Sequence, residues 1–339
     1  MLKIEKNKPL ASYTTFKIGA DAEFFAIIRS REDVVEAIQW AREHKKPIWI
    51  LGSGSNVLIS KKIKGLVLKN EIRGMNIVEK TDDYALAEAL SGENWSRFVS
   101  YTIDNDLYGL ENLFLIYGTV GAAPLQNIGA YGVEFKDHFY HLKAIDLKTG
   151  HEKIFALKDC RFTYRDSIFK RRLKGKYFIY SVTVKLSRHP EFKLDYGSIR
   201  ENLLAKGIKE PRLREVINTI QEIRNAKLPN PSLLPNAGSF FQNAVITLPT
   251  LKKLLKKYPA LPYFSSGRTK AKIPAGWLIE QSGWKGQKLG PVSMYEKQAL
   301  VMVSHGNAEA KHVLALAKKV KAAVKKKFGL DLKEEVNII

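Results

Sequence analysis

The sequence predicts an α+β fold of more than one domain. Strand-like and helical segments alternate in the first third of the chain, β-type segments recur from residue 82 to 186, and helical periodicity dominates after residue 201. The chain has 339 residues, enough for about two domains of roughly 150 residues, or three small ones. Hydrophobic residues make up 45% of it, which is ordinary for a folded protein and excludes a mainly disordered chain.

The individual elements follow from hydrophobic periodicity. Residues 31–45 place apolar side chains at near-helical spacing, and residues 213–224 form a second amphipathic helix. Short apolar runs, rich in β-branched and aromatic residues, predict strands or buried segments. These runs are residues 22–28, 47–51, 57–59, 66–68, 75–78 and 177–186.

A long basic helix is predicted near the C-terminus. Asn307 is its expected N-cap, the helix runs towards Phe328, and Gly329 lies where a helix C-terminal glycine belongs. Lysines crowd its last turns, where the helix dipole favours cations. Its apolar face comprises Val313, Leu316, Ala317, Val320, Val324 and Phe328. We therefore expect a structural surface helix.

The charge balance is strongly basic, with 56 Lys and Arg against 34 Asp and Glu, a formal net charge of +22. The lysines are scattered and do not interleave with aromatic residues, so a solvated basic surface is expected rather than a nucleic-acid site. The same positive field would suit a small substrate that carries phosphates.

Other classes of protein are excluded more directly. No stretch approaches the roughly 18–20 uninterrupted apolar residues of a membrane-spanning helix, and the N-terminus lacks the features of a secretion signal. The single cysteine, Cys160, permits no internal disulfide and no cysteine-based metal cage. The seven histidines are spread along the chain without a metal-binding pattern. We expect a cytoplasmic protein with no metal, no membrane and no nucleic acid as partner.

The loop Gly52-Ser53-Gly54-Ser55-Asn56 lies between two apolar runs. It lacks the third glycine of a dinucleotide-binding fingerprint, and β-branched residues follow it instead of a helix. It also lacks the Gly-Lys-Ser/Thr of a phosphate-binding P-loop. Such a loop can still expose consecutive backbone N–H groups to an anion. From composition alone, a phosphate cradle and an ordinary tight turn remain equally open.

A glycine-rich segment occupies residues 118–132, with four glycines, three alanines and no charged residue until Glu134. So little side chain lets backbone approach a flat or phosphorylated ligand closely. A flexible loop is the alternative, but the absence of charge favours a segment that is buried against a ligand.

Taken in order, these segments resemble the UDP-N-acetylenolpyruvoylglucosamine reductase (MurB) family. Each matching block is short, but the full series covers nearly the whole chain. The blocks are residues 14–19, 51–56, 118–132, 164–167, 196–197, 227–229, 236–241, 298–300 and 335–336.

The resemblance implies an FAD-binding fold of the vanillyl-alcohol-oxidase (PCMH) type in two parts, plus a C-terminal α+β substrate-binding domain. The implied boundaries are 1–68 with 329–339, then 69–205, then 206–328. FAD would be held without a covalent bond, and the 52–56 loop indeed holds no His or Cys to form one. The residues assigned to FAD are Gly52, Ser53, Gly54, Ser55, Asn56, Gly118, Gly121, Ala122, Gln126, Asn127, Gly129 and Ala130.

The implied reaction is an NADPH-dependent reduction of an enolpyruvyl ether on a UDP-sugar. Adding hydride to the terminal carbon of the C=C bond puts negative charge on the neighbouring carbon and its carboxylate. The site therefore needs polar groups that stabilise this charge and a positioned proton donor. The matching residues are Ser239 as proton donor, with Arg165 and Glu335 as the stabilising pair. Glu334 is adjacent to Glu335, but Val336 after it favours Glu335.

The resemblance also implies substrate contacts and a monomer. Tyr164, Tyr196, Lys227, Asn243 and Gln298 match positions that hold the UDP-sugar, and Tyr196 marks the longer family type, with a tyrosine loop and a split βαββ insertion. Tyr117 departs from the family pattern, which usually has proline there. Two alternatives stay open: another FAD-dependent oxidoreductase of the same superfamily, and a basic nucleic-acid-binding protein.

Overall fold

The computed structural model describes residues 2–339 and divides into two compact units. Unit 1 comprises the residues up to Lys8, Asp21–Ser53 and Lys62–Asn225. Unit 2 comprises Pro9–Ala20, Gly54–Lys61 and Ala226–Ile339. Two short N-terminal segments thus join the C-terminal third of the chain. Each unit is described by itself.

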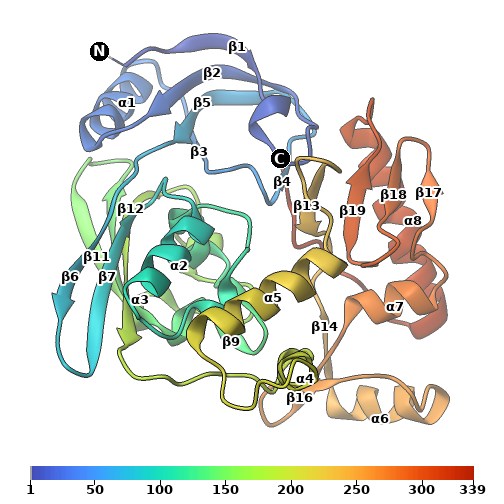
Figure 1. Cartoon of the computed structure of the whole chain (residues 1–339). Coiled ribbons are helices and arrows are strands. Elements are labelled where there is room, and N and C mark those ends of the chain that lie inside the picture. The colour runs from blue at the N-terminus through green and yellow to red at the C-terminus, as the bar shows by residue number, and fades with distance from the viewer. Residues whose placement is uncertain (1) are drawn as a thin grey trace. The chain divides into compact units, whose positions relative to one another are not determined.

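The first sheet of unit 1 has the strand order β1 (Glu5–Pro9), β2 (Asp21–Ile28), β5 (Ile63–Asn70) and β3 (Ile48–Leu51), with β5 parallel to β2 and β3. Helix α1 (Arg31–Glu43) packs on it (Figure 1). The Ser30 hydroxyl accepts from the Asp33 N–H, and the Asp33 carboxylate accepts from the Ser30 N–H, a capping box that fixes where α1 begins.

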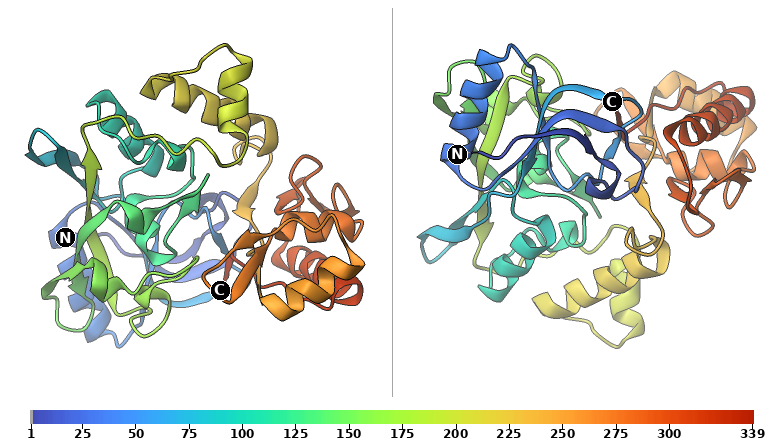
Figure 2. Two further views of the ribbon diagram at one scale, coloured as in Figure 1. Left: turned by 90° about the horizontal axis from the view of Figure 1, so that it is seen from below. Right: turned by 90° about the horizontal axis from the view of Figure 1, so that it is seen from above.

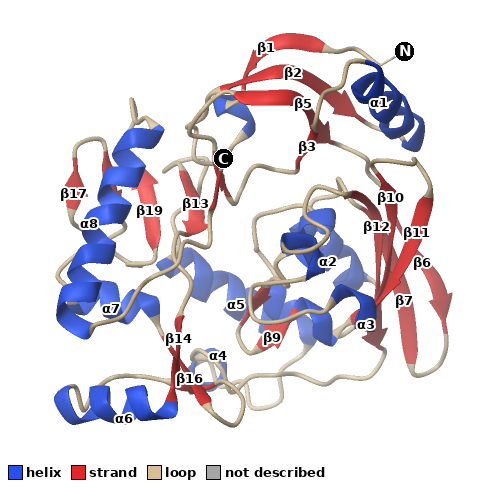
Figure 3. Cartoon of the chain, turned by 180° about the vertical axis from the view of Figure 1, so that it is seen from behind, coloured by secondary structure: helices blue, strands red, loops and turns tan. Residues whose placement is uncertain are grey.

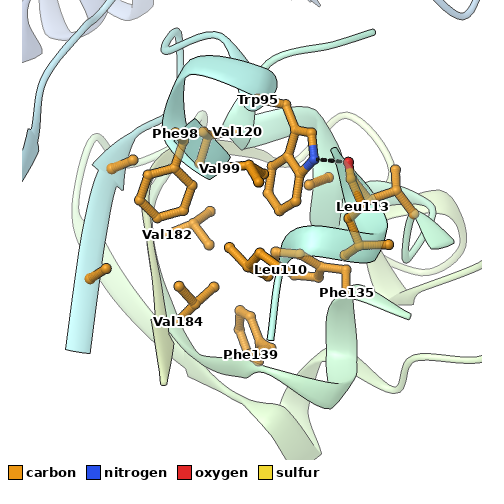
Figure 4. Close-up of a cluster of buried hydrophobic side chains, with 14 of the residues drawn as sticks. Trp95, Phe98, Val99, Leu110, Leu113, Val120, Phe135, Phe139, Val182 and Val184 are labelled. Carbon is orange, nitrogen blue, oxygen red and sulfur yellow. Dashed lines mark hydrogen bonds between the residues drawn. The ribbon is translucent and has the colours of Figure 1, made fainter. Parts of the chain in front are cut away.

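The second sheet of unit 1 is antiparallel, with the order β11 (Glu152–Ala156), β10 (Phe139–Asp146), β12 (Tyr177–Ser187), β7 (Tyr84–Leu90) and β6 (Met75–Lys80). The helix α2 (Trp95–Asp104) and the short α3 (Leu157–Cys160) lie beside it. Figure 4 shows the core between α2 and this sheet, where the Trp95 indole Nε1 donates to the Leu113 carbonyl at 2.9 Å.

Two further helices, α4 (Ile199–Ala205) and α5 (Leu213–Lys227), form a pair with an apolar cluster of their own (Figure 2). The glycine-rich segment folds as a 3₁₀ helix (Val120–Leu125) followed by a small hairpin of β8 (Gly129–Ala130) and β9 (Val133–Glu134).

Unit 2 is built on a sheet of β13 (Asn236–Ser239), β19 (Val301–Ser304), β18 (Val292–Met294) and β17 (Lys288–Leu289), in that order. Helix α8 (Ala310–Phe328) covers it and packs on α7 (Ala275–Gln281) (Figure 3). A second sheet orders β14 (Ala244–Thr247), β16 (Lys270–Ile273) and β15 (Phe264–Ser265), and α6 (Leu248–Lys257) follows β14. Finally, β4 (Val57–Leu58) pairs in parallel with β20 (Asn337–Ile338).

The predicted strands and the helices at 31–45 and 213–224 are confirmed, as are the buried face of α8 and its C-terminal Gly329 at φ +70°. The predicted N-cap Asn307 is wrong. Asn307 has φ +53°, in a turn after Gly306, and Glu309 is the cap, its extended backbone leading into Ala310. A turn residue two positions upstream cannot face the first N–H groups of the helix.

Over residues 2–339, no helix is both long and apolar enough to cross a membrane. The three-part domain division predicted from the sequence stays a prediction.

Candidate active site

Two glycines of the 52–56 loop, Gly52 and Gly54, lie so close to neighbouring atoms that a side chain at either position would clash. A Cβ on Gly52 would lie 2.8 Å from the Thr119 hydroxyl oxygen, within unit 1. In unit 2, Gly54 has φ +68°, and a Cβ there would lie 2.2 Å from the Tyr13 carbonyl oxygen. The Thr15 N–H donates to the Gly54 carbonyl at 3.2 Å. The loop is therefore a tightly fixed turn and not a mobile linker.

Gly52 joins the loop to the glycine-rich segment, residues 118–132, since Thr119 belongs to that segment. Gly121 lies as closely against Ser91: its N–H donates to the Ser91 carbonyl at 2.9 Å, and a Cβ would meet the Ser91 Cβ at 2.5 Å. Residues 52–53 and the glycine-rich segment, which the family resemblance assigns to the same ligand, are thus neighbours in unit 1.

Asn127 fixes the second half of the glycine-rich segment. Its backbone has φ +43°, a left-handed conformation that asparagine tolerates better than most residues. Its side-chain amide donates to Glu134 at 2.9 Å and to the Thr163 carbonyl at 3.2 Å, while its carbonyl oxygen accepts from the Lys136 N–H. Asn127 is buried and acts here as a structural clamp.

The segment 164–167 docks on the glycine-rich segment. The Arg165 Nη2 donates to the Gly129 carbonyl at 2.9 Å, and the guanidinium lies 5.8 Å from the centre of the Tyr164 ring. The Ser167 hydroxyl donates to the Leu125 carbonyl at 2.7 Å. Arg165 has φ +53°, a strained conformation of the kind found at functional sites, and it is only partly exposed.

Tyr196 reaches the same region of unit 1. A Cβ on Gly132 would contact the Tyr196 Cβ at 3.4 Å, and a Cβ on Gly197 would lie 2.9 Å from the Tyr131 ring. Burial raises the pKa of the Tyr196 phenol, and the positive charge of Arg165 opposes that shift, so the two side chains lie within electrostatic reach. Tyr164, Arg165 and Tyr196 therefore gather beside residues 129–132.

In unit 2, Ser239 and Glu335 lie on backbone segments that are joined by a hydrogen bond. Ser239 ends β13, and the Glu335 N–H donates to the carbonyl of Phe240, the next residue, at 2.8 Å. The carboxylate of Glu334 forms an ion pair with Lys321 of α8 at 2.8 Å. Glu334 is thus engaged on the α8 side, which leaves Glu335 as the better candidate of the two.

Asn56 from the 52–56 loop joins this group. Its amide nitrogen donates to the Glu335 carbonyl at 3.4 Å, and its carbonyl accepts from the Asn337 N–H at 3.1 Å, next to the β4–β20 pairing. A hydrogen bond therefore links Asn56, a predicted cofactor residue, to Glu335, a predicted catalytic residue that lies 279 positions away in the sequence.

The predicted substrate residues of unit 2 lie at the ends of several elements. Gln298 precedes β19, and its side-chain oxygen accepts from the Leu300 N–H at 3.3 Å. Leu300 in turn accepts from the Phe240 N–H at 2.8 Å. The Asn243 side-chain oxygen accepts from the Ala275 N–H at 2.9 Å, where α7 begins. Lys227 is exposed at the end of α5.

Several supporting residues were missed by sequence reasoning. The Lys69 ammonium donates to the Gly52 carbonyl at 2.9 Å, and burial lowers its pKa. The Thr15 hydroxyl donates to the Asn236 carbonyl at 2.7 Å. Arg224 donates to the Leu115 carbonyl at 3.0 Å, and burial lowers its pKa while Tyr131 opposes the shift. Lys69 and Arg224 are lone cations in a strand and a helix, so no local pattern marks them. Thr15 lies in the matching block 14–19, but the sequence assigned it no role.

The residues around the 52–56 loop and the glycine-rich segment fit the FAD that the sequence implies. At Gly52, Gly54 and Gly121 the space that a Cβ would take is already filled by other atoms of the protein, so these glycines let the chain pack closely on itself. The small side chains of both segments leave backbone groups that a ligand can approach. Among residues 2–339, no group of His, Cys, Asp and Glu is suited to hold a metal ion.

Comparison with protein families gives two matches. Residues 22–155 match the model of an FAD binding domain. Residues 230–339 match the model of the UDP-N-acetylenolpyruvoylglucosamine reductase C-terminal domain.

Curated relatives match along their whole length. A UDP-N-acetylenolpyruvoylglucosamine reductase of Flavobacterium johnsoniae is 41% identical over 339 residues, covering 100% of both chains. One of Pseudomonas aeruginosa is 42% identical over 337 residues, covering 99% of each. One of Bdellovibrio bacteriovorus is 41% identical over 334 residues, covering 98% of this chain and 99% of the relative.

Among solved structures, the crystal structure of UDP-N-acetylenolpyruvylglucosamine reductase from Thermus caldophilus superimposes with a TM-score of 0.66. It is 20% identical, and the match covers 100% of this chain and 99% of that one, so the likeness concerns the fold. The predicted fold class is confirmed as an FAD-binding domain followed by a C-terminal α+β domain.

Proposed function

The chain belongs to the UDP-N-acetylenolpyruvoylglucosamine reductase family, and from this we propose how its own residues carry out the family's reaction. It is an FAD-containing oxidoreductase that reduces the enolpyruvyl group of UDP-N-acetylglucosamine-enolpyruvate to give UDP-N-acetylmuramate, a step of peptidoglycan synthesis. The observation that carries this conclusion is identity of 41% over the full length of both chains. NADPH is the hydride donor of this reaction.

FAD, when bound, supplies hydride transfer from NADPH to the terminal carbon of the substrate C=C bond. The protein has to hold the cofactor and substrate together and to manage one proton and one developing negative charge. We assign FAD binding to the 52–56 loop and to Gly118, Gly121, Ala122, Gln126, Asn127, Gly129 and Ala130. The close packing of Gly52 against Thr119, which holds residues 52–53 beside the glycine-rich segment within unit 1, supports this assignment.

Ser239 is assigned as the proton donor to the carbon next to the substrate carboxylate. It is partly exposed at the end of β13, where a ligand can reach its hydroxyl. A serine hydroxyl is a poor acid in water, so the assignment requires that the bound ligands and polar neighbours activate it. Glu335 is one such neighbour, because its N–H donates to the carbonyl of Phe240, the residue after Ser239.

Arg165 and Glu335 are assigned to stabilise the negative charge that develops on the substrate carboxylate. The hydrogen bond from Arg165 to the Gly129 carbonyl holds the guanidinium beside the glycine-rich segment, so little reorganisation is needed during the reaction. A protonated Glu335 would donate a hydrogen bond to the same charge.

Tyr164, Tyr196, Lys227, Asn243 and Gln298 are assigned to the UDP-sugar. The Lys227 ammonium suits the diphosphate, and the two tyrosines supply flat, partly apolar surfaces with a polar end. We also propose a cytoplasmic monomer without nucleic-acid or membrane partners, divided into FAD-binding residues 1–68 with 329–339, FAD-binding residues 69–205, and substrate-binding residues 206–328.

An anaerobic visible spectrum tests the function. The purified protein should show flavin bands that bleach with NADPH and return with the UDP-linked enolpyruvyl sugar. A colourless protein that cannot be reconstituted with FAD would remove this function. Bands that bleach but do not return with that sugar would favour another FAD-dependent oxidoreductase.

The two half-reactions separate the role of Ser239. We expect Ser239→Ala to leave reduction by NADPH unchanged and to slow reoxidation by the enolpyruvyl substrate about 10²- to 10⁴-fold. Ser304→Ala, which removes a hydroxyl from the neighbouring strand β19, is the matched control and should change neither rate. Unchanged reoxidation in Ser239→Ala would exclude Ser239 from proton transfer.

A further inference from the structure

Unit 1 has a hollow of about 670 Å³ that involves none of the residues assigned above to FAD or to the UDP-sugar. Its lining residues come from the C-terminal end of α1, the turn between β10 and β11, and the segment before β12. Figure 3 labels these four elements. Its volume is in the ordinary range for small-molecule sites, about 300–1,000 Å³.

Charge distinguishes this hollow. Five cations line it, and Asp146 is the only carboxylate among its lining residues. The cations are Arg42, Lys45, Lys46, Lys148 and Lys176. Asp146 is already engaged, because one of its oxygens accepts the N–H groups of Lys148 at 2.8 Å and Thr149 at 3.1 Å. It therefore closes the β10–β11 turn, and its single negative charge, which interacts with Lys148, still leaves the lining with four more positive charges than negative ones.

Three of the lysines lack a carboxylate partner. Among residues 2–339, no ion pair involves Lys45, Lys148 or Lys176, whereas Lys46 is paired with Glu23. The Arg42 guanidinium donates to the Lys148 carbonyl at 2.7 Å, so it links two walls of the hollow. The positive charge here is thus left available to a ligand.

The backbone brings these lysines together from three separate segments. The Leu147 N–H donates to the Lys176 carbonyl at 2.9 Å, so the loop segments that carry Lys148 and Lys176 lie side by side. Lys45 follows His44, the C-cap of α1. A cation at the end of α1 is expected from the helix dipole alone. That explanation does not extend to Lys148 and Lys176, which belong to no helix.

We propose that this hollow binds an oligophosphate group, as found in inorganic tripolyphosphate or in a nucleoside triphosphate. Several lysine ammonium groups around one hollow suit a ligand whose charge is spread over successive phosphates. The apolar residues Ile38, Ile48 and Leu147 line the same hollow and could contact an attached nucleoside. This binding site is separate from the reductase site and does not depend on it.

Calorimetric titration of the FAD-containing protein with tripolyphosphate tests the proposal. The titration contains saturating UDP-N-acetylmuramate, so that the substrate site cannot take up the probe. We expect saturable binding of one tripolyphosphate per chain, weakening as salt rises. Absence of saturable binding at low salt would overturn the proposal.

Paired charge variants locate the site. We expect Lys148→Gln with Lys176→Gln to weaken tripolyphosphate binding about tenfold or more. Lys318→Gln with Lys319→Gln removes the same charge from the exposed side of α8 and should weaken it less than twofold. Equal weakening by both pairs would overturn the proposal, because it would mean that the general positive field binds the probe. Both double variants should keep the reductase activity.

Adenosine triphosphate distinguishes the two sources of the ligand. Equal affinities for tripolyphosphate and adenosine triphosphate would place recognition in the phosphates alone. Tighter binding of adenosine triphosphate, lost in Lys148→Gln with Lys176→Gln, would add the apolar wall to the site. Orthophosphate that binds as tightly as tripolyphosphate would contradict recognition of successive phosphates.

Discussion

Replacing Gly54 by alanine tests whether the 52–56 loop depends on its close backbone packing. Gly54 has φ +68°, and a Cβ would lie 2.2 Å from the Tyr13 carbonyl oxygen and 2.7 Å from the Thr14 Cα. Both atoms are backbone, so no side-chain rotation relieves the contact. Gly150, in the β10–β11 turn, is the matched control: it has φ +79°, and nothing lies within 4 Å of its Cβ position.

The difference between the two variants follows from these contacts. A left-handed alanine costs about 1–2 kcal/mol, and the lower entropy of its unfolded chain returns about 0.4–1 kcal/mol. Gly150→Ala should therefore destabilise the protein by about 1 kcal/mol. Gly54→Ala adds an overpacking cost of about 1–3 kcal/mol. The displaced backbone also weakens the hydrogen bond from Thr15 to Gly54, worth about 1 kcal/mol. We expect about 3–5 kcal/mol in total.

Urea unfolding measures the two free energies, and the flavin absorbance of the purified protein measures the bound FAD. We expect Gly150→Ala to retain FAD fully and Gly54→Ala to lose much of it, because the loop to which we assign FAD binding has to shift. This reasoning about the loop would be refuted if the free energies of unfolding of Gly54→Ala and Gly150→Ala differed by less than 1 kcal/mol and Gly54→Ala kept its full FAD content.

Three further predictions concern unit 1. Trp95→Phe should cost about 2–4 kcal/mol in urea unfolding, because it leaves the buried Leu113 carbonyl without its donor and removes core volume; a cost below 1 kcal/mol would contradict this. Burial raises the pKa of Cys160 to about 12, so a thiol reagent at pH 8 should label it only after unfolding, and labelling of the folded protein would show that it is accessible. Burial holds the pKa of His138 below its ordinary value of 6.5. The contribution of His138 to the free energy of unfolding is therefore fully present above pH 6.5 and falls on acidification, because the unfolded chain takes up the proton first. His138→Gln should flatten the loss of stability between pH 7 and 5, and an unchanged slope would assign that loss to other groups.

Local patterns predicted the regular elements well. The helix α8, the helix α1 and the strand β12 follow from periodicity within 11 to 19 consecutive residues, and α8 buries the face that its sequence predicted. The start of α8 was missed, because Asn307 and Glu309 lie two positions apart and only the backbone turn decides which of them is the cap.

The sequence by itself determined the family, through an ordered series of short motifs, and with it the chemistry that the chain performs. It also determined the elements, because helix and strand periodicity are properties of neighbouring residues. Only the tertiary structure decided which motifs meet. Asn56 and Glu335 share one hydrogen bond, Arg165 is held on the Gly129 carbonyl, and two N-terminal segments fold with the C-terminal third. In both hydrogen bonds a side chain donates to the backbone carbonyl of a residue distant in sequence, and because every residue carries such a carbonyl, no local pattern tells which one is used.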